Sequence, residues 1–487
     1  MRQSNKEFYR NKPRNPRVSF SRLAAYEVLA QVSEDGAYAN LALQQILKRR
    51  HLSHQDAAFA TELANGALRN QLFYRAILQK AIDRPLAKVD QKLLNVLYLA
   101  LHQLLSMRVA DHAAVDQSVN LAKKVAGEST AGFVNAILRK VQVHSKDEWL
   151  DVVLENTTDP LERMSIEFSH PVWIIRALKQ SLAVNGRSIE ELPQVLEANN
   201  IAPLVNLVAL DGLVRTQQMV RAGATESSVV KNAAEWKQGS LRQVPGITEG
   251  KVRVQDAGSQ LVARALTSVL LEGSDTQWLD LCAGPGGKAA LLTAIAQQRD
   301  AKLIANEVQK HRAELVKQAL KPLSRGHYEV RIDDGRKYGT NRENYYDRVM
   351  VDAPCTGLGS LRRRPEARWR KQMDDVAELV PLQKELLNSA YKATRVGGVI
   401  AYVTCSPHIS ETQRVIEWFF QQHPEAELLD TNAIMQSVAK EQVQENPPSN
   451  FKQQFLPENT KGSIAQLWPD IHRTDAMFCA LIKKGTA

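Results

Sequence analysis

The N-terminal part of the chain has a helical pattern of hydrophobic residues. From Ser21 to about His144, apolar positions recur every three or four residues, a spacing that places them on one face of an α-helix. The stretch from Leu93 to Met107 is so densely apolar that we expect it to form a central buried helix. The pattern predicts an all-α domain over residues 21–145.

The pattern becomes mixed over residues 146–254. Helical stretches such as Pro171–Ala183 alternate there with short β-like runs such as Pro203–Leu210. Turn signals separate these stretches at Asn185-Gly186, Asp211-Gly212 and Pro245-Gly246. We predict a small α/β module, whose topology the sequence does not fix.

Strand-like and helix-like patterns alternate from Gln255 to the end. This alternation indicates βα units, whose strands form a mostly parallel sheet with helices on both faces. We therefore predict a Rossmann-like α/β domain over residues 255–487. The expected strands are Gln277–Leu281, Lys302–Glu307, Tyr328–Asp333, Asp347–Asp352, Gly398–Thr404 and Ala476–Lys483.

Composition adds a bias toward a polyanionic partner. The chain has 63 Lys and Arg residues against 53 Asp and Glu residues, a net charge of +10, and its isoelectric point is about 9.3. This surplus favours a polyanion, although a basic enzyme without such a partner has the same balance. The first twenty residues are strongly basic, and we expect a flexible arm that is either a disordered terminus or a phosphate-contacting segment.

The cysteines and the apolar stretches indicate a cytoplasmic protein. Four cysteines lie far apart without metal-ligand spacing, so we expect neither a disulfide framework nor a metal site. Met1–Phe20 lacks the apolar core of a signal peptide. Leu93–Met107 is too short to span a bilayer, so no membrane partner is expected.

A glycine-rich loop follows the first strand of the predicted sheet. Such a loop lets the backbone approach a ligand, and its amides lie at a helix N-terminus. ATP is disfavoured because a P-loop needs Gly at Cys282 and Ser or Thr at Ala289, and the strict dinucleotide pattern also fails. The loop residues expected to bind a cofactor are Cys282, Ala283, Gly284, Pro285, Gly286, Gly287 and Lys288.

Acidic residues stand at the ends of four successive strands. Glu307 occupies the place where an acid accepts hydrogen bonds from a ribose, and Asp334 is placed to hold an adenine amino group. Together with Asp280 and Asp352 they form a row along one ligand crevice. Each acid alone is more often a helix cap or a solvated loop residue, but four in register indicate a common ligand. S-adenosylmethionine is the cofactor most consistent with this row.

Two cysteines follow the fourth and fifth strands, in Asp352-Ala353-Pro354-Cys355 and Thr404-Cys405-Ser406. Buried structural cysteines are common, yet strand ends of this sheet are where an α/β enzyme places its chemistry. A thiolate that adds to carbon 6 of a pyrimidine makes carbon 5 nucleophilic enough to take a methyl group. This reaction also needs a nearby acid, here Asp352, and a base turned out of its stack.

These motifs resemble the RNA cytosine-C5 methyltransferases. The resemblance rests on Asp-Ala-Pro-Cys, Thr-Cys-Ser, the glycine loop and the upstream run from Val254 to Gln260. It implies that Cys405 is the nucleophile and that Cys355 assists proton removal or enzyme release. In the DNA enzymes the Pro-Cys cysteine attacks instead, so the second motif distinguishes the two classes.

The helical first domain resembles the NusB fold. The matching residues include Gly66-Ala67-Leu68-Arg69, the run Ala131–Ala136 and Ser169-His170-Pro171. A NusB-like domain fused to such a catalytic domain is the arrangement of the bacterial 16S ribosomal RNA methyltransferase family RsmB (Fmu/Sun). The resemblance implies RNA binding by residues 21–145 and 146–254, a 16S ribosomal RNA partner and a monomer. Glu411-Thr412 and the strand at Leu204 depart from the family pattern, which affects RNA contacts rather than chemistry.

A basic run directly follows the Cys355 loop. Such a run is usually a solvated face, but its position and the stacking ability of Trp369 favour RNA contact. The expected RNA-binding residues are Arg362, Arg363, Arg364, Arg368 and Trp369. Lys288 is placed either at the cofactor carboxylate or at the target base, and residues 436–468 receive no role.

Three functions remain open from the sequence. The leading one is 16S ribosomal RNA cytosine-C5 methylation. The second is methylation of transfer RNA by the same chemistry. The third is a non-enzymatic RNA-binding or antitermination factor, against which Cys355, Cys405 and the cofactor loop argue.

Overall fold

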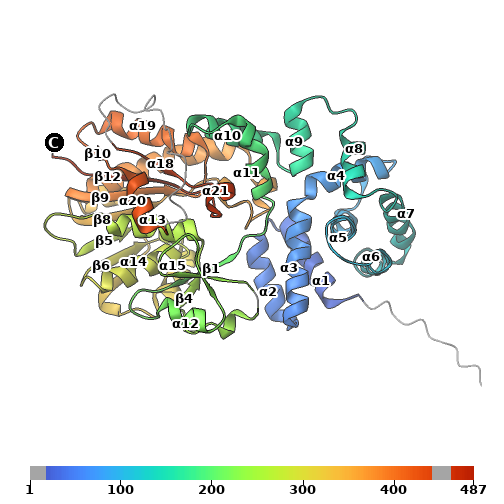
Figure 1. Ribbon diagram of the computed structural model, residues 1–487, viewed down its shortest axis with the longest axis horizontal. Coiled ribbons are helices and arrows are strands. Elements are labelled where there is room, and N and C mark those ends of the chain that lie inside the picture. Colours follow the sequence, from blue (N-terminus) through green and yellow to red (C-terminus); the bar gives the residue numbers. More distant parts are fainter. Residues whose placement is uncertain (1–17, 238, 441–461, 487) are drawn as a thin grey trace, which may run out of the picture. The chain divides into compact units, whose positions relative to one another are not determined.

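A computed structural model describes residues 18–237, 239–440 and 462–486. The chain divides into two compact units, Met1–Ser169 and His170–Ala487, which are drawn from blue to green and from green to red in Figure 1. Residues 1–17 of the expected basic arm lie outside the described residues, as does most of the segment 436–468. Ser19 caps the first helix, since its side chain accepts a hydrogen bond from the Arg22 backbone amide.

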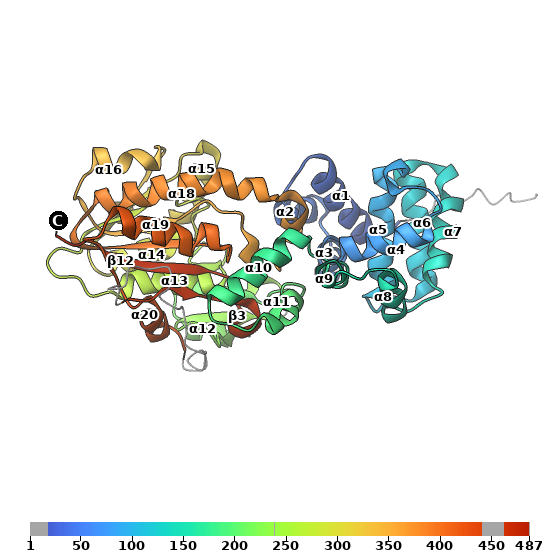
Figure 2. The same ribbon diagram turned by 90° about the horizontal axis from the view of Figure 1, so that it is seen from above.

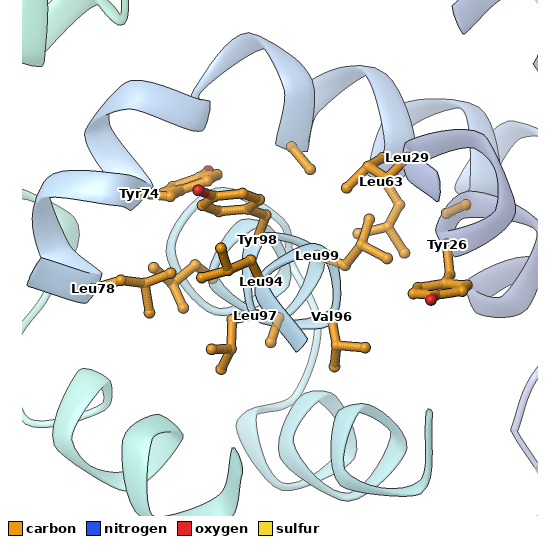
Figure 3. Close-up of a cluster of buried hydrophobic side chains, with 14 of the residues drawn as sticks. Tyr26, Leu29, Leu63, Tyr74, Leu78, Leu94, Val96, Leu97, Tyr98 and Leu99 are labelled. Carbon is orange, nitrogen blue, oxygen red and sulfur yellow. The ribbon is translucent and has the colours of Figure 1, made fainter. Parts of the chain in front are cut away.

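The first unit is helical throughout, as the sequence predicts. It contains α1 (Phe20–Glu34), α2 (Ala39–Arg50), α3 (His54–Arg69), α4 (Gln71–Ala81), η1 (Leu86–Lys88), α5 (Gln91–Leu105), α6 (Asp111–Ala126), η2 (Glu128–Thr130), α7 (Ala131–Val141), α8 (Lys146–Leu154) and α9 (Pro160–Phe168). Figure 3 shows α5 surrounded by the other helices, with Leu94, Leu97 and Leu99 directed into the shared core. The dense apolar run thus forms the expected central helix.

The compact helical unit runs beyond residue 145. Trp149, Val153 and Leu154 of α8 are buried in the same hydrophobic core as α5, and the Trp149 indole donates a hydrogen bond to the Val141 carbonyl oxygen (2.8 Å). An amphipathic helix must bury its apolar face against a neighbour. For this reason α8 and α9 belong to the helical unit, whereas the pattern along the sequence changes character at residue 146.

The second unit begins with a small α/β module. Its elements are α10 (Val172–Val184), η3 (Ile189–Glu191), α11 (Leu192–Ala198), β1 (Val205–Ala209), α12 (Thr216–Arg221), β2 (Thr225–Glu226), β3 (Ala233–Trp236), η4 (Leu241–Gln243) and β4 (Val252–Val254). The four strands form an antiparallel sheet in the order β2-β3-β1-β4. The expected strand at 203–210 corresponds to β1.

The larger part of the second unit alternates strands and helices. Its elements are α13 (Ala257–Ser268), β5 (Gln277–Asp280), α14 (Gly287–Gln297), β6 (Lys302–Asn306), α15 (Lys310–Leu320), η5 (Arg325–His327), β7 (Tyr328–Arg331), η6 (Gly335–Lys337), α16 (Tyr338–Asn341), β8 (Tyr346–Asp352), η7 (Leu358–Ser360), α17 (Ala367–Arg370), α18 (Met373–Ala393), β9 (Thr394–Thr404), η8 (Ile409–Glu411), α19 (Gln413–Gln422), β10 (Glu427–Leu428), α20 (Thr431–Val438), β11 (Ala465–Gln466), α21 (Pro469–His472) and β12 (Phe478–Lys483).

These strands form one eight-stranded, mostly parallel sheet, as predicted. Its order is β10-β12-β9-β8-β5-β6-β7, with β11 paired to β12. The five strands from β5 to β9 pair in parallel, and β12 lies antiparallel to β9. Because β5 lies between β6 and β8, the order reverses there, and a crevice forms outside the carboxyl ends of strands at such a point.

Helices cover both faces of the sheet (Figure 2). Side chains of α13, α14 and α20 form one buried cluster with one face of the strands, and those of α18 and α19 form another with the opposite face. The parallel strands other than the edge strand β7 are therefore buried on both sides, which explains their largely apolar sequences. No helix in the described part of the chain is long and apolar enough to cross a membrane.

Candidate active site

The glycine loop joins β5 to the N-terminus of α14. Gly286 has φ +103°, and a Cβ atom there would lie 2.5 Å from the Ala319 Cβ atom and 3.0 Å from the Val316 Cα atom. A Cβ atom on Gly284 would overlap the Glu307 carboxylate. Glycine is thus required at Gly286 by conformation and by close approach, whereas a side chain at Gly284 would displace the Glu307 carboxylate. The loop leaves a side-chain-free surface beside Glu307, as a bound cofactor requires.

The four acids lie in one row, because the sheet order places their strands side by side. From β8 to β7 the order is Asp352, Asp280, Glu307 and Asp334. Both carboxylate oxygens of Asp280 are buried and have no hydrogen-bond partner within the described residues. Burial, and then the charge of Asp352, raise the pKa of Asp280 to about 8. Orphaned buried oxygens next to the glycine loop fit a site built for a polar ligand.

The two acids farther along the row have partners in this structure. Glu307 accepts a hydrogen bond from the Gln309 backbone amide (3.0 Å) and forms an ion pair with Arg312 (3.2 Å). Asp334 pairs with Arg336 (2.8 Å), whose hydrogen bonds are the main reason that the pKa of Asp334 is lowered. Each of these acids therefore has an arginine partner at the crevice.

Lys288, the last residue of the loop, is bound to Asp352. Its Nζ atom lies 2.9 Å from the Asp352 Oδ2 atom, and both side chains are largely buried. Burial works against the charge of Lys288, but the attraction and hydrogen bond of Asp352 outweigh it and raise the lysine pKa. The pair connects the cofactor loop to the strand end that precedes Cys355.

The two cysteines meet above this pair. Their Sγ atoms are 3.4 Å apart, although 50 residues separate them in the chain. The parallel pairing of β8 with β9 brings their strand ends together, since Asp352 lies opposite Val403. The Gly359 backbone amide donates a hydrogen bond to the Cys405 carbonyl oxygen (2.9 Å), which ties the loop after Cys355 to the loop after β9.

The charges around the two sulfur atoms differ. A hydrogen bond from Cys355, aided by the positive charges of Arg364 and Lys288, lowers the pKa of Cys405 despite its burial. The pKa of Cys355 is raised by the same hydrogen bond, by burial and by the nearby Glu411. The arrangement favours a thiolate at Cys405 and a thiol at Cys355.

Glu411 fixes the Cys355 loop, a role that the sequence does not indicate. Its buried carboxylate accepts hydrogen bonds from the Thr356 backbone amide (2.8 Å) and hydroxyl (2.5 Å), and from the Gln383 amide (3.2 Å). It lies six residues after Cys405, and only the fold shows that it turns back toward the other cysteine.

Three of the four arginines expected to contact RNA are paired within the protein. Arg362 and Arg363 pair with Asp256 and Asp475. Arg368 is buried and donates a hydrogen bond to the Asn199 carbonyl oxygen (2.9 Å). Buried guanidinium groups need such partners, so these three side chains hold the loop in place instead of forming an open face. Arg364 is exposed and Trp369 is partly exposed.

The sequence of this chain matches two known protein families. Residues 268–483 match the family described as "16S rRNA methyltransferase RsmB/F", and residues 19–143 match the NusB family. The chain is 39% identical over 476 residues to the Mycobacterium tuberculosis protein named "Putative methyltransferase Rv1407", covering 97% of this chain and 98% of that protein. The chain belongs to the RsmB/F methyltransferase family.

A ribosomal RNA methyltransferase and a solved structure are also similar to this chain. The Yersinia pseudotuberculosis "Ribosomal RNA small subunit methyltransferase B" is 29% identical over 418 residues, covering 84% of this chain and 92% of that one. The solved structure titled "Crystal Structure of PH0851" has a TM-score of 0.75 at 20% identity and covers 97% of this chain and all of that one, which shows a common fold. Members of the RsmB/F family are S-adenosylmethionine-dependent ribosomal RNA methyltransferases, and the glycine loop and acid row fit that cofactor.

Proposed function

We propose that this RsmB/F methyltransferase methylates carbon 5 of a cytosine in 16S ribosomal RNA through a covalent Cys405 adduct. The observation that carries the proposal is the 3.4 Å contact between Cys355 and Cys405, beside the Lys288–Asp352 pair. A methyltransferase that acts on a nitrogen or oxygen atom has no need of a thiolate, because such atoms already hold a reactive electron pair.

The residues have separate roles in this reaction. When bound, S-adenosylmethionine supplies an electrophilic methyl group. The Cys405 thiolate forms a bond to carbon 6, and the displaced electron pair makes carbon 5 nucleophilic while Asp352 stabilises the adduct at nitrogen 3. After carbon 5 is methylated, its proton passes to a water molecule, and Cys355 assists this step. The C–H electron pair restores the double bond, and Cys405 leaves as a thiolate.

We also propose that Arg364 and Trp369 contact the RNA. Arg364 is exposed and lies close enough to lower the pKa of Cys405. Trp369 is partly exposed and offers a ring on which an unpaired base can stack. Arg362, Arg363 and Arg368 act on the RNA indirectly, by holding this loop.

Variants of the two cysteines test the chemistry. With a 16S ribosomal RNA transcript, Cys405→Ala should abolish methyl transfer. Cys355→Ala should accumulate a protein–RNA complex that survives denaturing electrophoresis, and the double variant should not. Cys479→Ala, which removes a buried cysteine of β12, is the matched control and should stay active. A complex that forms with Cys405→Ala but not with Cys355→Ala would reverse the two roles.

The RNA target is tested separately. Bisulfite mapping of 5-methylcytosine in total RNA, with and without the gene, should lose one signal in 16S ribosomal RNA. Loss of a transfer RNA signal instead would establish the other substrate. Intact 5-methylcytosine in every RNA would contradict the proposed reaction.

A further inference from the structure

Gln255 is a buried residue whose side-chain amide has no protein partner among the described residues. It is 8% exposed, and neither its amide nitrogen nor its amide oxygen has a hydrogen-bond partner within the described residues. A buried amide without partners is costly, so it normally marks a place for a bound group. The backbone around it is firmly held: the Gln255 amide donates to the Asn206 carbonyl oxygen (3.0 Å), and the Gln260 side chain donates to the Gln255 carbonyl oxygen (2.9 Å).

The side chain faces the glycine loop. A Cβ atom on Gly287 would lie 3.8 Å from the Gln255 amide nitrogen, so this amide is directed at the first residue of α14. The first hydrogen bond along the start of that helix runs from the Ala290 amide to the Gly286 carbonyl oxygen. The amides of the first turn have no acceptors within a helix and favour an anion at this end.

The acid row indicates which part of the cofactor lies between Gln255 and the N-terminus of α14. Glu307 is placed for the ribose, and Asp334 lies one strand farther from the loop than Glu307. The amino-acid end of S-adenosylmethionine must extend the other way, toward the loop and the N-terminus of α14. Lys288 is already held by Asp352 (2.9 Å), and Arg312 by the Gly284 carbonyl oxygen (2.6 Å) and Glu307 (3.2 Å). Within the described residues, the helix amides and Gln255 are therefore the donors at this loop that we assign to a carboxylate.

We infer that Gln255 binds the amino-acid end of S-adenosylmethionine, with its side-chain amide donating a hydrogen bond to the carboxylate. This role adds a residue from outside the glycine loop and the acid row. The inferred contact involves the cofactor and not the RNA base. If the experiment contradicts it, the proposed cytosine chemistry is unaffected.

Calorimetry with two ligands tests the inference. S-adenosylhomocysteine carries the carboxylate, whereas 5'-methylthioadenosine lacks the whole amino-acid end. Gln255→Ala should weaken S-adenosylhomocysteine binding by about tenfold or more and change 5'-methylthioadenosine binding by less than about twofold. Gln255→Glu should weaken S-adenosylhomocysteine binding further, because two carboxylates would face each other.

Two variants separate binding from folding. Gln255→Met keeps the volume of the side chain without its hydrogen bond and should lose as much affinity as Gln255→Ala. Gln466→Ala removes another buried glutamine with an unpartnered Oε1 atom in the described residues, on β11, and should bind both ligands normally. Equal weakening of the two ligands by Gln255→Met, or full affinity for S-adenosylhomocysteine, would overturn the inference.

Discussion

Burial and the negative charge of Asp352 raise the pKa of Cys405, and its other neighbours lower it. Burial raises the pKa of a thiol because it disfavours the thiolate. The hydrogen bond from Cys355 and the charges of Arg364 and Lys288 favour the thiolate, and together they lower the pKa of Cys405. The neighbouring sulfur thus contributes to stabilising the Cys405 thiolate.

This coupling predicts a pH shift in Cys355→Ala. Loss of the donor destabilises the Cys405 thiolate, so the pKa of Cys405 rises and its thiolate fraction at a given pH falls. The rate of Cys405 alkylation by iodoacetamide, followed by peptide mass spectrometry, should therefore reach its half-maximum at higher pH than in the unaltered protein. Cys479→Ala should leave the profile in place. A profile that is unchanged or displaced to lower pH in Cys355→Ala would contradict the assigned direction.

Among the elements, the loop between β8 and α18 depends on contacts with distant segments. The Gly359 backbone both donates to Cys405 (2.9 Å) and accepts from the Ala476 amide (2.8 Å). A Cβ atom on Gly359 would overlap the Ala476 carbonyl oxygen and lie 2.8 Å from that of Cys405. Both neighbours are backbone atoms, which cannot turn aside as a side chain does.

Gly359→Ala should therefore destabilise the second unit by about 1–3 kcal/mol. Urea unfolding followed by tryptophan fluorescence measures this difference. Gly326→Ala is the control, because its Cβ atom would meet only the Ser324 hydroxyl oxygen, at 4.0 Å. Equal midpoints for the two variants would show that the loop has more room than its contacts indicate.

At the scale of the whole molecule, the boundary of the helical unit determines which fragments of the chain should fold on their own. The second compact unit starts at His170, and the cofactor loop, the acid row and both cysteines lie within it. The buried face of α8 belongs to the helical core instead.

A fragment of residues 170–487 should bind S-adenosylhomocysteine as the full chain does, within about twofold by calorimetry. A fragment of residues 145–487 should bind it equally well but aggregate more readily, since α8 would expose Trp149, Val153 and Leu154 without their partners. Light scattering compares the two. A fragment 170–487 that does not bind the ligand would show that the helical unit supports the cofactor site.

The sequence by itself determined the helices and strands, the acid row and the closeness of the two cysteines. Helical and strand periodicities are local, so α5 and the strands β5 to β9 could be read directly. Residues at the carboxyl ends of parallel strands necessarily meet at one edge of the sheet. For that reason the acid row and the closeness of Cys355 and Cys405 were predictable without coordinates.

The tertiary structure alone decided which polar groups are paired. Arg362 looked like an RNA ligand, but it meets Asp256 and Asp475, which lie 106 and 113 residues away in the chain. The same holds for Glu411, which reaches Thr356 across 55 residues, and for Gln255, which is left without a partner in the described chain. A pairing of this kind depends on the path of the chain in three dimensions, whereas periodicity records only which side of an element faces the core.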